Sequence, residues 1–96
     1  MPTMSAVKAI RAIVTGRVQG VGFRYATLRE AQQRGLTGWV RNISAGQVEV
    51  LAQGSATAVD DLVAWLAAGP RLASVVKVEV AATEPDLDLS TFHVRF

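Results

Sequence analysis

Residues 7–35 read VKAIRAIVTGRVQGVGFRYATLREAQQRG, and the periodicity of this stretch changes twice. Residues 7–15 alternate between apolar and polar side chains, which predicts a strand. The apolar face of this strand consists of Ile10, Ala12 and Val14. Residues 16–22 contain three glycines, so we expect a loop there rather than a helix or a strand. Residues 23–34 predict a helix followed by Gly35, a residue type common at left-handed helix caps.

A hairpin is expected after this helix. Residues 36–42 and 47–53 each predict a strand, and residues 43–46 provide the turn between them. One face of the second strand carries Val48, Val50 and Ala52. The two strands are therefore expected to pair directly.

A second helix has the most regular pattern in the chain, because its apolar residues are spaced i, i+3, i+4 and i+7. These residues are Val59, Leu62, Val63 and Leu66. Ser55 or Thr57 can cap its N-terminus, and Gly69-Pro70 ends it. Residues 76–82 and 92–96 predict two further strands, separated by a loop that contains Pro85. The alternating apolar residues of the first of these are Val76, Val78, Val80 and Ala82.

The resulting order is strand, helix, strand, strand, helix, strand, with an extra C-terminal strand. This order is typical of the split β-α-β arrangement of ferredoxin-like α+β folds. We expect an antiparallel-rich sheet with both helices on one face, because neither helix can bury its apolar stripe alone. The length of 96 residues predicts a single domain over residues 1–96. The fold by itself does not indicate a function.

The composition indicates a globular protein without cysteine chemistry. Half of the residues are apolar and 19% are charged, which is typical of a globular chain. The sequence has no cysteine, which excludes disulfides, thiolate metal sites and cysteine nucleophiles. We find no signal peptide and no run of about 18 apolar residues that would cross a membrane. We therefore expect a soluble cytoplasmic protein.

The charge is unevenly distributed along the chain. Residues 1–45 carry seven basic residues against one acidic residue, a balance of +6, and the remainder carries −4. A basic half indicates an anionic partner. A phosphate compound, a nucleic acid or no partner at all are each compatible with this charge.

The loop around residues 16–22 has the properties of an anion site. Glycines allow successive backbone N–H groups to point toward one anion, and the following helix contributes its positive N-terminal end. Arg24 lies in the first turn of that helix and adds a guanidinium. Neither standard nucleotide motif is present, since Val21 replaces the second glycine of a Walker A loop and Tyr25 the third of a dinucleotide fingerprint. A tight turn whose arginine faces water remains the alternative.

Two segments of the chain together resemble the acylphosphatase family over nearly its whole length. The first is Gly16-Arg17-Val18-Gln19-Gly20-Val21-Gly22-Phe23-Arg24. The second is Gly38-Trp39-Val40-Arg41-Asn42, followed by Gly46-Gln47-Val48 and by Gly54. Every fixed position of both family signatures is filled, and the C-terminal segment Phe92-His93-Val94-Arg95-Phe96 is similar to the family's closing strand.

The resemblance implies roles for particular residues. Arg24 matches the arginine that binds phosphate in the family, and Asn42 matches the asparagine that positions the attacking water. Phosphate binding is implied for Gly16, Arg17, Val18, Gln19, Gly20, Val21, Gly22 and Phe23. We expect Trp39 and Trp65 to lie in the core, and His93 to face solvent without a catalytic role.

The chemistry of an acyl phosphate explains why so few groups would suffice. Its leaving group is a carboxylate whose conjugate acid has a pKa of roughly 4, so it departs without being protonated. Phosphoryl transfer then needs mainly positioning and charge stabilisation. We expect no metal and no cofactor, and by analogy with the family the substrate's own phosphate accepts the proton of the water.

Other functions stay open at this point. A ferredoxin-like module could hold a phosphate-bearing ligand without turnover. A basic sheet face could bind RNA, although that mode usually requires exposed aromatic side chains. Related domains also occur in larger maturation proteins that use carbamoyl phosphate, for which this chain is short. We expect a small acyl phosphate and inorganic phosphate as ligands, no nucleic acid, no membrane and a monomer.

Overall fold

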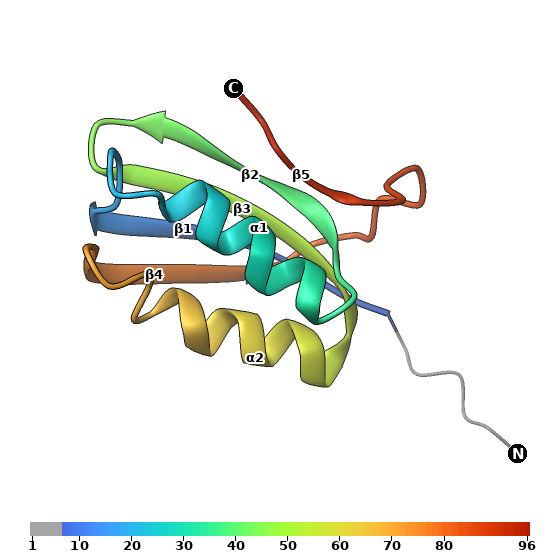
Figure 1. Cartoon of the computed structure of the whole chain (residues 1–96). Coiled ribbons are helices and arrows are strands. Elements are labelled where there is room, and N and C mark those ends of the chain that lie inside the picture. Colours follow the sequence, from blue (N-terminus) through green and yellow to red (C-terminus); the bar gives the residue numbers. More distant parts are fainter. Residues whose placement is uncertain (1–6) are drawn as a thin grey trace, which may run out of the picture.

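The computed structural model describes residues 7–96 and contains five strands and two helices (Figure 1). In chain order these are β1 (Val7–Arg17), α1 (Phe23–Gln33), β2 (Thr37–Ser44), β3 (Gln47–Ser55), α2 (Ala56–Leu66), β4 (Ser74–Ala82) and β5 (Phe92–Val94). The predicted order of elements is confirmed. The expectations about a signal peptide and about the start of the domain involve residues 1–6, which lie outside the described residues.

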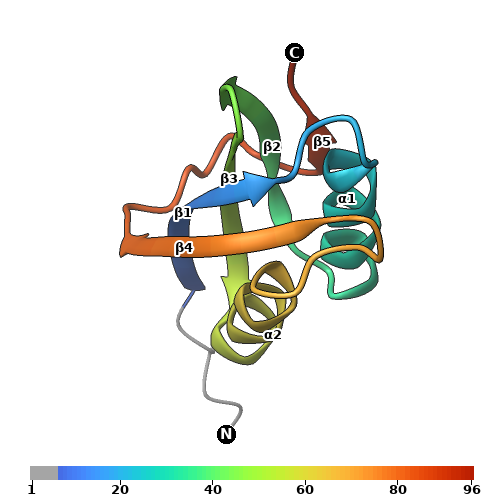
Figure 2. The same cartoon turned by 90° about the vertical axis from the view of Figure 1, so that its left-hand side faces the viewer.

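The five strands form one mixed sheet in the order β4-β1-β3-β2-β5. All neighbouring strands are antiparallel except β2 and β5, which are parallel. Figure 2 shows β1 and β3 in the middle of this sheet, with both helices on the same side of it. The predicted ferredoxin-like α+β class, with an extra C-terminal strand, is confirmed.

The core lies between the helices and one face of the sheet. Its fully buried large side chains come from both layers, with Phe23, Leu62, Leu66, Val14, Val48 and Val50 among them. Helix α1 contacts β2 and β5, while α2 contacts β1 and β3. Among the described residues, no helix lies over the opposite face of the sheet, as Figure 2 shows. The alternating patterns along the strands thus divide the sheet into a helix face and an open face.

Helix α2 begins as the sequence predicts. Ser55 is its N-cap, and the Ser55 hydroxyl accepts a hydrogen bond from the backbone N–H of Ala58 at 3.3 Å. Helix α1 has Gly22 at the same position, so no side chain caps its N-terminus. The difference leaves the N-terminal end of α1 open to an external acceptor.

The predicted loop boundary at Gly16 is wrong, because Gly16 and Arg17 belong to β1. They pair with Val75 and Ser74 of β4 after a register shift that leaves Val76 as an extra residue in β4. A Cβ atom at Gly16 would lie 2.1 Å from the backbone oxygen of Ser74. Glycine at this position is therefore explained by the close approach of two strands, and the loop proper starts at residue 18.

The same bulge changes the face to which Val76 belongs. The alternating pattern placed Val76 with Val78 and Val80, but Val76 is 81% exposed, whereas Val75 packs against the core. Other boundaries also differ from expectation, since β2 continues through Ser44, β3 continues through Ser55, β4 begins at Ser74 and β5 ends at Val94. Asn42 therefore lies inside a strand and not at its end.

The two tryptophans occupy different layers. Trp65 is partly buried and packs against the core from α2. Trp39 is buried as expected, but it alternates with the core residue Val40 and so lies on the open face. Within residues 7–96, no helix is long and apolar enough to cross a membrane.

Replacing Gly16 with alanine tests whether this glycine serves the approach of β1 to β4. We expect Gly16→Ala to lower the free energy of unfolding by roughly 2–6 kcal/mol, the sum of one strained backbone conformation and one overpacked contact. Urea denaturation measures the change. Gly35→Ala is the matched control, because Gly35 also has a positive φ but a Cβ atom there would meet nothing within 4 Å. Equal losses in the two variants would contradict the steric explanation.

Candidate active site

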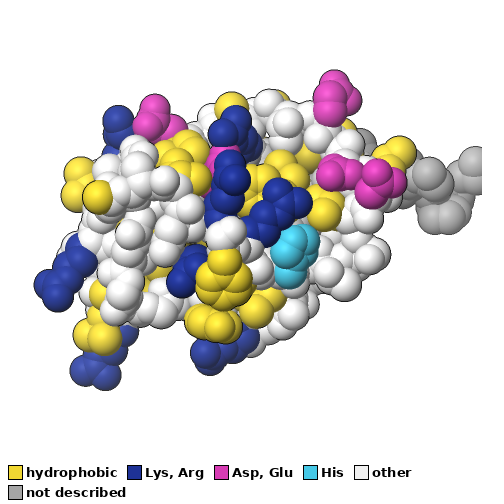
Figure 3. Space-filling view, turned by 90° about the horizontal axis from the view of Figure 1, so that it is seen from above, with side chains coloured by type: hydrophobic (Ala, Val, Ile, Leu, Met, Phe, Trp, Pro, Cys, Tyr) yellow, Lys and Arg dark blue, Asp and Glu magenta, His cyan; other side chains and the backbone are white. Residues whose placement is uncertain are grey.

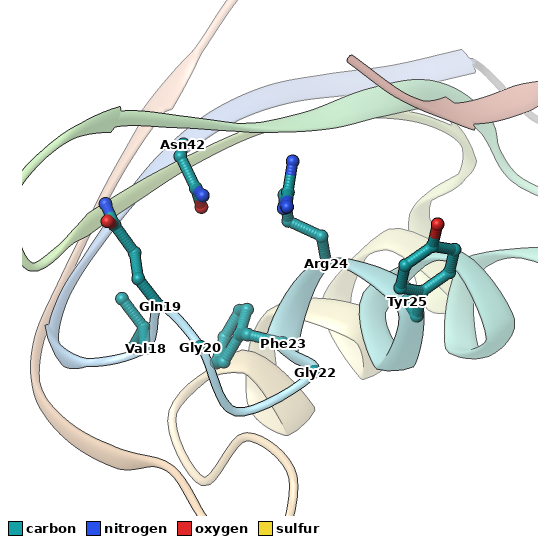
Figure 4. Close-up of a pocket in the computed structure, with 8 residues that line it drawn as sticks. All are labelled: Val18, Gln19, Gly20, Gly22, Phe23, Arg24, Tyr25 and Asn42. Carbon is teal, nitrogen blue, oxygen red and sulfur yellow. The ribbon is translucent and has the colours of Figure 1, made fainter. Parts of the chain in front are cut away.

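A pocket of about 180 Å³ opens between the loop of residues 18–22, the N-terminus of α1 and strand β2 (Figure 4). Its lining residues are Val18, Gln19, Gly20, Gly22, Phe23, Arg24, Tyr25 and Asn42. The volume is below the usual range for drug-sized ligands, so the pocket suits a small polar group.

The loop turns sharply because two of its residues have left-handed backbone conformations. Gly20 has a φ of 74° and Gly22 a φ of 77°. Side-chain-bearing residues rarely adopt such values, whereas glycine does so without steric cost. A run of turn conformations with left-handed residues is the geometry in which successive N–H groups can surround an anion.

The N-terminus of α1 adds further donors to this region. The first backbone bond of the helix joins the N–H of Ala26 to the oxygen of Gly22 at 3.0 Å. The N–H groups of Phe23, Arg24 and Tyr25 therefore have no partner within the helix. No acidic side chain lies in the first turn, and Gly22 offers no capping side chain. The positive end of the helix dipole is thus directed at the pocket without internal neutralisation.

Arg24 extends from the first turn of α1 toward β2, as Figure 4 shows. Among residues 7–96, no carboxylate forms an ion pair with its guanidinium. Its central carbon lies 4.9 Å from the centroid of the Phe96 ring, a cation–π distance. The hydrogen-bond donors of Arg24 therefore remain available to an anion in the pocket.

Asn42 reaches the same pocket from the sheet. It alternates with Val40, which is fully buried on the helix face, so its side chain also points to the helix side. The side chain is exposed and forms no hydrogen bond to residues 7–96. Figure 4 shows the Asn42 amide and the Arg24 guanidinium directed into the same space from different elements. Asn42 thus presents both a donor and an acceptor next to a fixed positive charge.

Gln19 holds the loop against the β2–β3 turn. Its amide nitrogen donates to the backbone oxygen of Gln47 at 3.0 Å and also to that of Ser44. The N–H of Gly16 donates to the oxygen of Gly46 at 2.9 Å, which makes a second link between the same segments. The loop that approaches Arg24 and the strand that carries Asn42 are therefore joined by direct hydrogen bonds.

Seven of the ten residues proposed for the site from the sequence line this pocket, and three do not. The N–H of Gly16 already donates to the backbone oxygen of Gly46, and Arg17 is exposed at the end of β1. Val21 is partly buried and packs against the core. Their roles in binding a substrate stay predictions. Tyr25 lines the pocket but was not proposed, although its position directly after Arg24 in the first helical turn could have indicated it.

Few charged groups surround the site. Among residues 7–96, no three His, Asp or Glu side chains lie close enough together to hold a metal ion. His93 lies on β5, partly buried and outside the pocket. Arg24 is the one charged side chain among the residues that line the pocket.

Comparison with known proteins places the chain in one family. The family model described as Acylphosphatase matches residues 10–94. A protein named Acylphosphatase from Trichormus variabilis is 51% identical over 90% of this chain and 84% of its own length. Another from Nostoc sp. is 49% identical over 98% of this chain and 91% of its own. The structure of an acylphosphatase from Coxiella burnetii superimposes with a TM-score of 0.88 at 39% identity, covering 93% of each chain. The chain belongs to the acylphosphatase family.

Proposed function

We propose that Arg24, the N-terminus of α1 and Asn42 carry out the reaction of the acylphosphatase family in this chain. The chain is a hydrolase that splits acyl phosphates into a carboxylate and inorganic phosphate. The observation that supports the assignment is the convergence of Arg24 and Asn42, from a helix and a strand, on one small pocket beside an uncapped helix end. The resemblance of the two signature segments supports the same residues.

The phosphate group of the substrate would lie against the loop and the first turn of α1. The N–H groups of Phe23, Arg24 and Tyr25 lack helical partners, and the Arg24 guanidinium can bind two phosphate oxygens at once. These donors are fixed before the substrate arrives, so they stabilise charge on the phosphoryl group without reorganising. Gln19 would keep this arrangement at a constant distance from Asn42 through its bonds to the β2–β3 turn.

Asn42 would position the attacking water. Its amide can accept a hydrogen bond from the water and donate another, which fixes the orientation of the nucleophile. The attacking oxygen forms a bond to phosphorus as the bond from phosphorus to the carboxylate oxygen breaks. The proton of the water passes to the phosphate of the substrate, and the carboxylate leaves as an anion. No protein side chain needs to act as an acid in this scheme, since the leaving group is weakly basic.

The pocket recognises the phosphate rather than a particular acyl group. Its volume of about 180 Å³ is compatible with a small acyl phosphate, and its polar groups are those that bind an anion. That the protein works as a cytoplasmic monomer, without nucleic acid or membrane partners and as one domain, also remains a proposal from the sequence.

Removing the Asn42 amide tests its role in catalysis. We expect Asn42→Ala to lower kcat by at least about 100-fold, the effect of misplacing a reacting group. KM and the inhibition constant of phosphate should change much less, because the water is not part of the ligand. Steady-state kinetics with a simple acyl phosphate measures all three. Since Asn42 is exposed, the melting temperature should stay nearly unchanged.

Ile43→Ala provides the control for that experiment, because Ile43 is the next residue of β2, is exposed and does not line the pocket. Its kcat should stay within a factor of two of the unchanged protein. A folded Asn42→Ala protein with normal kcat would show that another group positions the water.

Phosphate should stabilise the protein through Arg24. At a hundredfold excess over the dissociation constant, we expect inorganic phosphate to raise the free energy of unfolding by about 2.7 kcal/mol through mass action. Arg24→Ala should lose most of this stabilisation, whereas Arg29→Ala should keep it. Arg29 lies on the same helix, is exposed and does not line the pocket. Thermal unfolding with and without phosphate measures the effect. Equal shifts of the melting temperature in Arg24→Ala and Arg29→Ala would show that phosphate acts through general salt effects.

Turnover should not need a divalent metal. The leaving group of the acyl phosphate is a stable carboxylate, and Arg24 already supplies positive charge at the phosphate. We therefore expect kcat to be unchanged after dialysis against a chelator and after addition of magnesium or zinc ions. Loss of activity on chelation, with recovery on adding one ion, would refute the proposed scheme.

A further inference from the structure

The open face of the sheet carries a cluster of arginines that the catalytic site does not use. Arg11 on β1, Arg41 on β2 and Arg95 just after β5 form this cluster, which we call the arginine face. Figure 3 shows it as dark blue side chains next to the single histidine, His93, in cyan. Arg41 belongs to the second signature segment, yet it points away from the pocket that contains Asn42.

A buried carboxylate fixes two of the three arginines. The side chain of Glu49 on β3 is 1% exposed and lies between Arg11 and Arg41. The Nε of Arg41 donates to Glu49 Oε1 at 2.6 Å, and Arg11 binds Oε2. The side chains of Arg11 and Arg41 remain 57% and 42% exposed. Both guanidiniums are therefore held in place from below and still present N–H groups to solvent.

An aromatic ring positions the third arginine. The central carbons of Arg95 and Arg41 lie 4.6 Å and 5.1 Å from the centroid of the Trp39 ring. The parallel register of Val40 with Val94 places Arg41 and Arg95 on neighbouring strands. No carboxylate of residues 7–96 forms an ion pair with Arg95. Arg41 and Arg95 thus contact the same indole ring, and of these two guanidiniums only that of Arg41 has a carboxylate partner among residues 7–96.

The charges on this face do not balance. One carboxylate, Glu49, faces three guanidiniums, and the nearby Glu79 of β4 is paired with Lys77 at 3.4 Å. The Gln53 side chain binds the backbone of Asp86, so the acidic connection between β4 and β5 borders the face at one end. Within residues 7–96, none of the acidic side chains of that connection pairs with the arginine face. A surplus of positive charge therefore persists between this acidic border and the β2–β3 turn.

We propose that the arginine face is a docking surface for an acidic segment of a partner protein, one that carries several carboxylates close together. The guanidinium fork matches a carboxylate in shape and binds it through two parallel hydrogen bonds. The three arginines start from different strands, β1, β2 and the end of β5, and their guanidiniums gather around Glu49 and Trp39, so the face offers several guanidinium forks close together. A chain of carboxylates can contact all three.

The same features argue against a nucleic acid as the occupant. Trp39 is only 9% exposed and is covered by two guanidiniums, so it offers no ring on which a base can stack. Three arginines are also few compared with the 6–10 phosphate contacts, roughly, of a strong non-specific binder. The docking surface lies on the opposite side of the sheet from the pocket, and the proposal does not depend on the mechanism above.

A fluorescein-labelled decaglutamate peptide tests the proposal in a fluorescence anisotropy titration at low salt. We expect Arg95→Gln to weaken binding about threefold and Arg41→Gln with Arg95→Gln at least about tenfold, as expected for lost charge-assisted contacts. Arg29→Gln with Arg71→Gln removes the same net charge from exposed sites elsewhere and should change the affinity less than twofold. Arg24→Ala should likewise change it less than twofold, which separates this surface from the pocket.

A second readout reports on the site directly. In a Trp65→Phe protein, Trp39 is the one remaining tryptophan, and its fluorescence should change as the peptide saturates. Arg95→Gln leaves both partners of Glu49 in place, so a melting curve should show it folded even if the double variant is not. If the arginine-face double variant and the control double variant lost peptide affinity equally, net charge alone would explain the binding, and the proposal would be overturned. Tighter binding of labelled decauridylate, with the same arginine dependence, would overturn it in favour of a nucleic acid.

Discussion

The alternation of side chains along β2 is the constraint on which both faces of this molecule depend. Val40 and Asn42 point to the helices, while Trp39 and Arg41 point to the open face. The antiparallel register of Val40 with Val50 on β3 fixes this division. A slip of one residue would exchange the two sets, moving an arginine into the pocket and the asparagine out of it. Pairing with the central strand β3 therefore sets the chemistry of each face.

Much of the fold could be predicted because its patterns are local. The helix α2 shows an apolar stripe and a serine cap, and β1 and β3 alternate regularly. The errors occurred where a contact between distant segments decides the structure. Gly16 looked like a loop residue, but its partner in β4 lies some sixty residues away and draws it into the sheet. Val76 is exposed for the same reason, since the bulge it occupies is a property of the pair of strands.

The pocket could be located in part from the sequence, because a family resemblance singled out Arg24 and Asn42, which both line it. The sequence could not show how they are held together, since the amide of Gln19 binds backbone oxygens more than twenty residues away. Nor could it show that Glu49 is buried. Alternation along β3 places Glu49 on a face without helices, where an exposed side chain is expected. It is buried because Arg11 and Arg41 cover it, and such a pairing follows only from the strand order.

The structure also explains why the positive charge of the first 45 residues does not mark one site. Lys8 and Arg34 pair with Asp60 and Glu30, and Arg24 alone among the basic residues lines the pocket. Arg41 and Asn42 are consecutive, so their Cα atoms are about 3.8 Å apart although their side chains face opposite ways. The basic residues of this half of the chain are therefore divided between the two faces of the sheet, with Arg24 at the pocket and Arg11 and Arg41 around Glu49 on the open face.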